Sequence, residues 1–196
     1  ATVAALAAEV EHWQRRMPTP EPQVSAPDAQ ADASEAEATD WQPLSAMQEQ
    51  IWFVQHLAPQ SQVYHCPVAF RIHGSLDAQR LASSITRLCL HHPLLRAVFA
   101  TIQGRPMQRI HSAPTFALQT HDLRDQPADA RDALAVPSVQ ELLRRPFHLE
   151  QAAGAAFLFQ ESDSQSLFVL LLHHIITDGW SVDQLLHELS AEYEGR

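Results

Sequence analysis

The chain has 196 residues, of which 45% are hydrophobic and 18% are charged, so it is long enough to bury the core of one ordinary domain. Its 23 acidic residues outnumber its 13 basic residues, all of which are arginine, and a net charge of −10 argues against nucleic acid as a partner. The longest apolar run, Leu167–Leu172, is too short to cross a membrane.

The first 40 residues divide into two segments of different composition. Apolar residues recur every three or four positions in 2–17, which predicts an amphipathic helix that must dock on another surface. Residues 18–40 are rich in Pro, Ala, Gln and Ser and have acidic residues but no arginine, so they are predicted to form a disordered linker. The globular part is expected to begin near Trp41.

The rest of the chain alternates between helical and strand patterns. In chain order, the sequence predicts helix 45–57, strand 63–73, helix 77–91, a hairpin of 95–102 and 107–111, strand 116–120, helix 128–145, a second hairpin of 155–161 and 167–173, and helix 182–194. This mixture predicts an α+β fold in which helices flank a mixed or mostly antiparallel sheet.

Local residue types refine three of these helices. Ser45 and Gln48 form a capping-box pattern at the start of the first helix, and Ser181 is expected to cap the last. Pro137 interrupts the pattern of 128–145, so the firmer part of that helix is expected to be 138–145.

The densest group of polar residues in an apolar region follows the run Leu167–Leu172. His173 and His174 come directly after it, and Asp178 and Gly179 follow shortly afterwards. Neighbouring strand residues point to opposite faces, so we expect one histidine to face packed structure and the other a cavity. Because histidine titrates near pH 6.5, the second position suits a general base.

Two other interpretations stay open on the residues alone. Both histidines could be hydrogen-bonded core residues, or they could bind a metal ion together with Asp178. Neighbours that point to opposite faces cannot easily hold one ion, so we expect no metal site. Cys66 and Cys89 lack metal-like spacing, and nothing resembling a secretory signal precedes them, which favours a reduced, cytoplasmic compartment.

A family resemblance gives the histidine pair a specific meaning. The string His173-His174-x-x-x-Asp178-Gly179, followed by Trp180 and Ser181, resembles the His-His-x-x-x-Asp-Gly motif of condensation domains of nonribosomal peptide synthetases. Two further stretches agree in order and spacing. Residues 44–52 (LSAMQEQIW) resemble the opening motif of that family, and residues 92–99 (HPLLRAVF) resemble its second motif.

Several positions depart from the usual pattern of the family. Met47 stands where Ala is usual, Gln50 where Arg is usual, Pro93 where Glu is usual, and His148 where Asp is common. None of them touches the string 173–179. These departures bear on the subtype of condensation domain, and with it on the stereochemistry of the donor residue, more than on the family.

The resemblance implies a particular domain organisation. The family has two chloramphenicol-acetyltransferase-like lobes with the active site in a tunnel between them, and residues 41–196 resemble only the N-terminal lobe. The predicted helix 1–17 resembles the last helix of a carrier domain, which precedes a condensation domain across a linker such as 18–40. No cofactor is expected on this chain itself, because the phosphopantetheine arms belong to the partner carrier domains.

The resemblance also implies a reaction and a role for each residue. The complete domain joins an acyl or peptidyl thioester to the amine of an aminoacyl thioester, with His174 in the tunnel and His173 in a structural role. We expect Asp178 to form a buried ion pair with Arg96, so that Asp178→Ala is strongly destabilising. Gly179 is expected to allow a tight turn without obstructing the tunnel, while Trp180 and Ser181 contribute packing and helix capping.

Other functions within and outside this family remain possible on sequence. Cyclisation domains replace both histidines with aspartate, and epimerisation domains have a different opening motif, so both are disfavoured. A stand-alone acyltransferase and a non-catalytic module that recruits a partner enzyme stay open as alternatives. Arg144 and Arg145 could contact acidic carrier domains, or they could simply form a solvated helix face.

Overall fold

The computed structural model describes residues 40–195, so the predicted helix 1–17 and nearly all of the linker 18–40 lie outside the described residues. The elements are β1 (Gln42–Pro43), α2 (Ala46–Leu57), β2 (His65–His73), α3 (Ala78–His91), η1 (Pro93–Arg96), β3 (Ala97–Ile102), β4 (Arg105–Ile110), β5 (Leu118–Asp122), α4 (Ala128–Arg144), β6 (Gly154–Ser162), β7 (Gln165–His173) and α5 (Gly179–Glu194). Within 40–195, none of the helices has the length and apolar character needed to cross a membrane.

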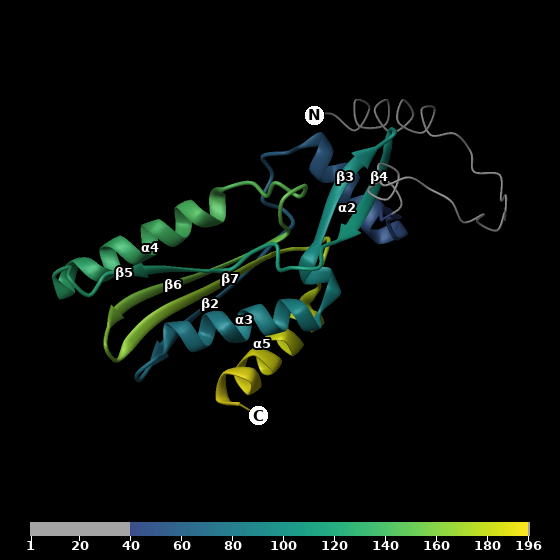
Figure 1. Ribbon diagram of the computed structural model, residues 1–196. Helices are drawn as coiled ribbons and strands as arrows, with labels where there is room; N and C mark the ends of the chain where they lie inside the picture. The colour runs from purple at the N-terminus through teal and green to yellow at the C-terminus, as the bar shows by residue number, and fades with distance from the viewer. Residues whose placement is uncertain (1–39, 196) are drawn as a thin grey trace.

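The strands form two sheets. The larger has the order β2-β7-β6-β5, with antiparallel pairing except between β5 and β6, which are parallel. The smaller has the order β1-β4-β3 and is antiparallel, and its hairpin extends away from the larger sheet (Figure 1). Both predicted hairpins are therefore confirmed, and the mixed sheet agrees with the predicted α+β class.

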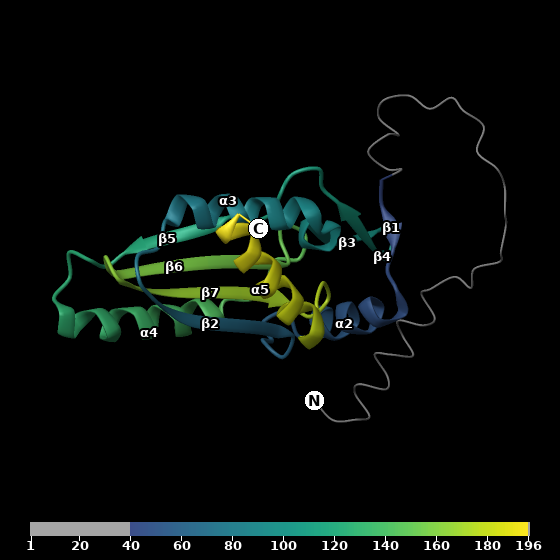
Figure 2. The ribbon, with the colours of Figure 1, turned by 90° about the horizontal axis from the view of Figure 1, so that it is seen from below.

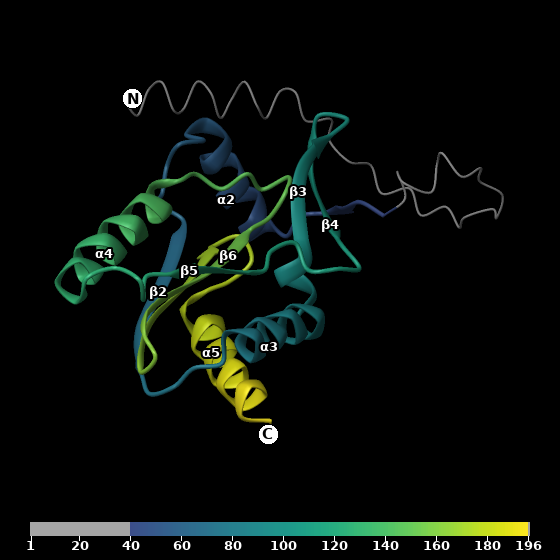
Figure 3. The ribbon, with the colours of Figure 1, turned by 60° about the vertical axis from the view of Figure 1, so that its left-hand side comes forward.

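Helices cover both faces of the larger sheet. Strand residues alternate between the two sides, so Ala156 and Leu158 of β6 join the core formed with α3 and α5, whereas Phe157 and Phe159 join a second core formed with α4. Figures 1 and 3 show the sheet between these helix layers, and Figure 2 shows α5 crossing in front of it. The interior of the described fold is therefore built by β6 and β7, which are buried on both faces.

Side-chain caps define the starts of α2 and α3, and the first of them was predicted. The Ser45 side chain accepts from the N–H of Gln48, whose own side chain accepts from the N–H of Ser45, so the predicted capping box is confirmed. Asp77 caps α3 through the N–H groups of Gln79 and Arg80. Strand β5 begins two residues later than the sequence predicted, at Leu118 rather than Phe116.

Helix α4 differs from the expectation because it continues through Pro137. Proline lacks the N–H that would bond to the carbonyl four residues earlier, which normally weakens a helix. On both sides of Pro137, however, apolar residues such as Ala135 and Val139 pack against the same sheet face. The burial of this face stabilises one continuous helix, and the next residue, Ser138, donates its hydroxyl to the carbonyl of Leu134 at 2.7 Å.

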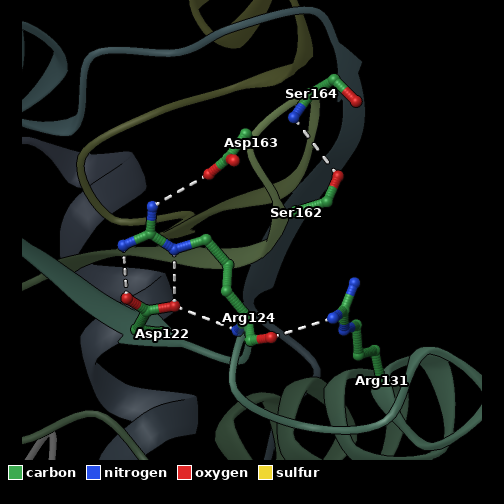
Figure 4. A network of polar contacts seen from close by, with 6 residues as sticks. All are labelled: Asp122, Arg124, Arg131, Ser162, Asp163 and Ser164. Carbon is green, nitrogen blue, oxygen red and sulfur yellow. Dashed lines mark hydrogen bonds and ion pairs between the residues drawn. The ribbon is translucent and has the colours of Figure 1, made fainter.

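One exposed arginine connects the loop after β5 to two other segments (Figure 4). The guanidinium of Arg124 donates to both carboxylate oxygens of Asp122, at 2.9 and 2.6 Å, and to Asp163 in the β6–β7 turn at 3.2 Å. Its carbonyl accepts from Arg131 of α4 at 2.8 Å. The hydrogen bonds from Arg124 lower the pKa of Asp122 to about 2. Because these groups are exposed, the network orders the loop more than it stabilises the fold.

Candidate active site

The two adjacent histidines lie at the end of β7 and differ sharply in burial. His173 is 0% exposed, whereas the side chain of His174 is exposed. Both rings lie near the ring of Tyr64, whose centroid is 5.9 Å from that of His173 and 6.3 Å from that of His174. The burial of His173 agrees with the expectation that one histidine faces packed structure, and the cavity expected beside the other stays a prediction.

His173 is held as a neutral ring by its hydrogen bonds and its surroundings. Its Nδ1 accepts the N–H of Ile175 at 3.2 Å, so the proton is on Nε2, which lies 3.4 Å from Oε1 of Gln55. The rings of Tyr64 and Phe147 lie 5.9 and 5.5 Å from it, centroid to centroid. Burial, and then the nearby imidazoles of His65 and His174, lower the pKa of His173 to about 4.

His174 has the opposite tautomer. Its Nδ1 lies 2.6 Å from the carbonyl oxygen of Thr177, and a carbonyl only accepts, so Nδ1 carries the proton. The lone pair of neutral His174 is therefore on Nε2. Its backbone N–H donates to the carbonyl of Tyr64 at 2.8 Å, which anchors the end of the strand. The side chain thus presents an oriented proton acceptor at the surface of the described fold.

Asp178 is the N-cap of α5, a role that the sequence assigned to Ser181. The carboxylate of Asp178 accepts the N–H of Ser181 at 2.8 Å, and this bond is the main cause of a lowered pKa for Asp178. The helix consequently starts at Gly179, three residues earlier than predicted. An aspartate at this position also interacts favourably with the helix dipole.

The expected ion pair between Asp178 and Arg96 does not form in the part of the chain that the structure describes. Arg96 instead donates to three backbone carbonyls, those of Cys89 at 3.0 Å, Leu90 at 3.5 Å, and His111. These bonds satisfy carbonyls at the end of α3 and tie that end to the residue after β4. The sequence pattern correctly marks Arg96 as a supporting residue, but the prediction of its partner was wrong.

The exposed cap changes the expected effect of Asp178→Ala. Because the carboxylate caps a helix and is not buried in an ion pair, we expect the Tm of the lobe to fall by only a few degrees, with no loss of soluble protein. Asp178→Ser, which retains a capping oxygen, should restore most of this loss. Thermal unfolding followed by circular dichroism measures both values. A collapse of soluble expression in Asp178→Ala alone would contradict the capping role.

Gly179 and Trp180 also differ from the expectation. Gly179 does not have a positive φ, and a Cβ built on it would meet no atom within 4 Å outside its chain neighbours and its own helix backbone, so the described residues do not require glycine there. Trp180 is 82% exposed and borders a hollow of about 210 Å³ together with Leu94 and Ile176. The indole therefore does not pack into the core of the described residues.

Sequence reasoning missed two glutamines that contact this turn. Gln48 donates from Nε2 to the carbonyl of Ile175 at 3.3 Å, and Gln55 accepts from His173. Gln48 was assigned only to the capping box, and Gln55 was not singled out. A polar residue on the buried face of an amphipathic helix was the available indication. Within residues 40–195, His, Cys, Asp and Glu form no cluster that could hold a metal ion.

Comparison with known proteins identifies the family of this chain. The family model described as Condensation domain matches residues 38–196. The chain belongs to the condensation-domain family. One protein of the linear gramicidin synthase of Brevibacillus parabrevis is 38% identical over 162 residues, which cover 82% of this chain and 3% of that protein. Isonitrile lipopeptide synthase of Mycobacterium tuberculosis is 34% identical over 155 residues, 79% of this chain and 6% of that protein.

Solved condensation domains share the fold of this chain. The starter condensation domain of rhizomide synthetase aligns with a TM-score of 0.71 at 24% identity, covering 78% of this chain and 37% of that chain. The first condensation domain of the calcium-dependent antibiotic synthetase, in complex with a substrate analogue, gives a TM-score of 0.69 at 23% identity, with 80% and 39% covered. The predicted chloramphenicol-acetyltransferase-like α+β fold is confirmed, and the chain spans well under half of these domains.

Proposed function

We propose that this chain is the N-terminal lobe of a condensation domain that forms amide bonds in a nonribosomal peptide synthetase. Family membership and the names of the synthetases that match the chain support this proposal. The substrates are an upstream acyl or peptidyl thioester and the amine of a downstream aminoacyl thioester, each on the phosphopantetheine arm of a carrier domain. The second lobe completes the tunnel, and the enzyme acts in the cytoplasm.

The orientation of His174 is the observation that favours this chemistry. In the reaction, the amine nitrogen attacks the thioester carbonyl, a C–N bond forms, the C–S bond breaks, and the amine proton ends on the released thiol. A group that accepts this proton needs an unprotonated nitrogen directed outward. The bond from Nδ1 to Thr177 leaves Nε2 of His174 free for this task, as a base or as a group that positions the amine.

The remaining residues have supporting roles in this proposal. His173 packs inside the lobe and shapes the turn, Asp178 fixes the start of α5, and Arg96 secures the end of α3. We also propose that residues 1–17 are the last helix of a carrier domain and that 18–40 are the linker that follows it. Arg144 and Arg145 are exposed and available to a carrier domain.

The test is reconstitution of the complete two-lobe domain with loaded donor and acceptor carriers. Mass spectrometry of the acceptor carrier should detect the amide product only when both thioesters are present. A folded two-lobe domain that yields no product with any donor and acceptor thioester native to its synthetase would contradict the proposal. That result would favour a module that only recruits a partner enzyme.

Gly179→Ala separates stability from function. Because no atom of this lobe lies within 4 Å of the added methyl group, we expect an unchanged or slightly higher Tm. The proposed tunnel wall adjoins this position in the complete domain, so amide formation should fall at least tenfold. Circular dichroism and the product assay measure the two effects. Full activity in the variant would show that the tunnel does not need glycine at this position.

A further inference from the structure

Two buried glutamines of α2 contact the turn that holds His174. Gln48 and Gln55 are 9% and 6% exposed and lie two helical turns apart on the same face of α2. Gln55 contacts His173, the residue before His174, and Gln48 contacts Ile175, the residue after it. A helix far away in sequence therefore contacts the side chain of the residue before His174 and the backbone of the residue after it.

Three hydrogen bonds in series lead from the N–H of Ile175 through His173 to Gln55 and the carbonyl of Pro59. The N–H of Ile175 donates to Nδ1 of His173 at 3.2 Å, which leaves the ring proton on Nε2. That Nε2–H donates to Oε1 of Gln55 at 3.4 Å, and Nε2 of Gln55 donates to the carbonyl of Pro59 at 3.2 Å. Because an amide side chain has one donor end and one acceptor end, the bond to Pro59 fixes which end of Gln55 faces His173.

We propose that Gln55 is a positioning residue for His174. Its acceptor oxygen selects the Nε2–H tautomer of His173, this tautomer accepts the N–H of Ile175, and the peptide group between His174 and Ile175 is thereby held in one orientation. The other tautomer would place two donors, Nδ1–H of His173 and N–H of Ile175, against each other in a buried site. The inference rests on the proposed function, which assigns the reacting position to His174.

Gln55 is the residue of α2 that accepts the Nε2–H of His173. Among the described residues, the titratable groups around the ring are Tyr64, which precedes β2, His65 of β2, and His174, which follows β7. Phe147, from the segment after α4, is apolar and neutral. Buried hydrogen bonds in series strengthen one another, and the loss of one bond leaves a buried polar group without a partner.

The first test is Gln55→Met in the complete two-lobe domain with loaded carriers. Methionine has a similar length but cannot accept a normal hydrogen bond, so Nε2–H of His173 loses its partner. We expect kcat to fall about tenfold to a hundredfold, with the KM for the acceptor thioester unchanged, because a misplaced group loses rate without losing binding. Gln50→Met, the same substitution on the exposed side of α2, should keep the wild-type kcat.

The second test is Gln55→Glu, which keeps an acceptor oxygen for Nε2–H of His173. At alkaline pH we expect activity above that of Gln55→Met, because the variant keeps the bond to His173 although it loses the one to Pro59. A carboxylate beside the ring favours the protonated imidazole, whose two nitrogens are both donors, so Ile175 then loses its acceptor. The acid limb of the kcat profile should therefore move upward by at least one pH unit. A residue that only packs would not shift this limb.

The outcomes separate this inference from the proposed function. Wild-type kcat in folded Gln55→Met, or an unmoved acid limb in Gln55→Glu, would overturn the positioning role. If Gln55→Met does not fold, the acid limb of Gln55→Glu decides alone. His174→Ala belongs in the same assay, because full activity in that variant would reject the proposed function itself. Loss of activity in His174→Ala together with unchanged Gln55 variants would reject only the role of Gln55.

Discussion

Replacing His174 by alanine in the complete domain should lower the rate of amide formation by about two to four orders of magnitude, the usual contribution of general acid–base assistance. The same change should leave the Tm within about a degree of wild type, because the side chain is exposed and surface substitutions have small effects on stability. The rate is measured by single-turnover transfer between loaded carriers, which separates chemistry from carrier binding.

Two further variants make this result specific. His187 is also an exposed histidine that bonds a nearby backbone carbonyl, and His187→Ala should keep the wild-type rate. His174→Gln retains a polar side chain that can hold the amine but cannot act as a base near neutral pH. A rate close to wild type in His174→Gln would assign His174 to positioning, and a rate as low as that of His174→Ala would assign it to proton transfer.

Stability of the domain should fall as the pH falls from about 6.5 to about 4, with His173 as a main cause. An unfolded chain binds a proton on this residue near pH 6.5, whereas burial holds the folded ring neutral down to about 4. The contribution of neutral His173 to the free energy of unfolding is therefore complete above pH 6.5 and is lost as the pH falls toward 4. A pKa shift of this size corresponds to a change of about 3 kcal/mol in the free energy of unfolding. Urea unfolding at a series of pH values measures this change.

His173→Asn separates this effect from that of other groups. Asparagine does not titrate, so we expect a flatter pH dependence between 6.5 and 4 even though His65 still titrates. At pH 7.5 the variant should lose about 2–4 kcal/mol, because the smaller side chain leaves a cavity and removes the bond to Gln55. His187→Asn is the matched control and should reproduce the wild-type curve. An equally steep curve for His173→Asn would show that other groups cause the acid loss.

Much of the fold and part of the site were predictable from local patterns. The capping box of Ser45 and Gln48, the helix that Asp77 caps and both hairpins follow from residue types within a few positions of each other. The expectation that His173 and His174 have different surroundings follows from strand alternation. Local geometry decides all of these features, and local sequence specifies local geometry.

The errors concern features that depend on competition between partners. Asp178 had two possible uses, a helix cap and an ion pair with Arg96, and sequence cannot rank them because the distance to Arg96 is a tertiary quantity. Similarly, Pro137 predicted a break in α4, but the burial of apolar residues on both sides of it outweighs the lost hydrogen bond. A nearby hydrogen bond thus decided the role of Asp178, and the burial of many apolar side chains decided the continuity of α4.

The sequence by itself determined the family, the α+β class and the position of the histidine pair at the end of a buried strand. Only the tertiary structure decided which histidine is buried, which ring nitrogen of each carries the proton, and that Gln48 and Gln55 of α2 hold the turn between them. The reason is physical: periodicity fixes direction along one element, whereas burial, tautomer and hydrogen-bond partner depend on which other elements pack against it.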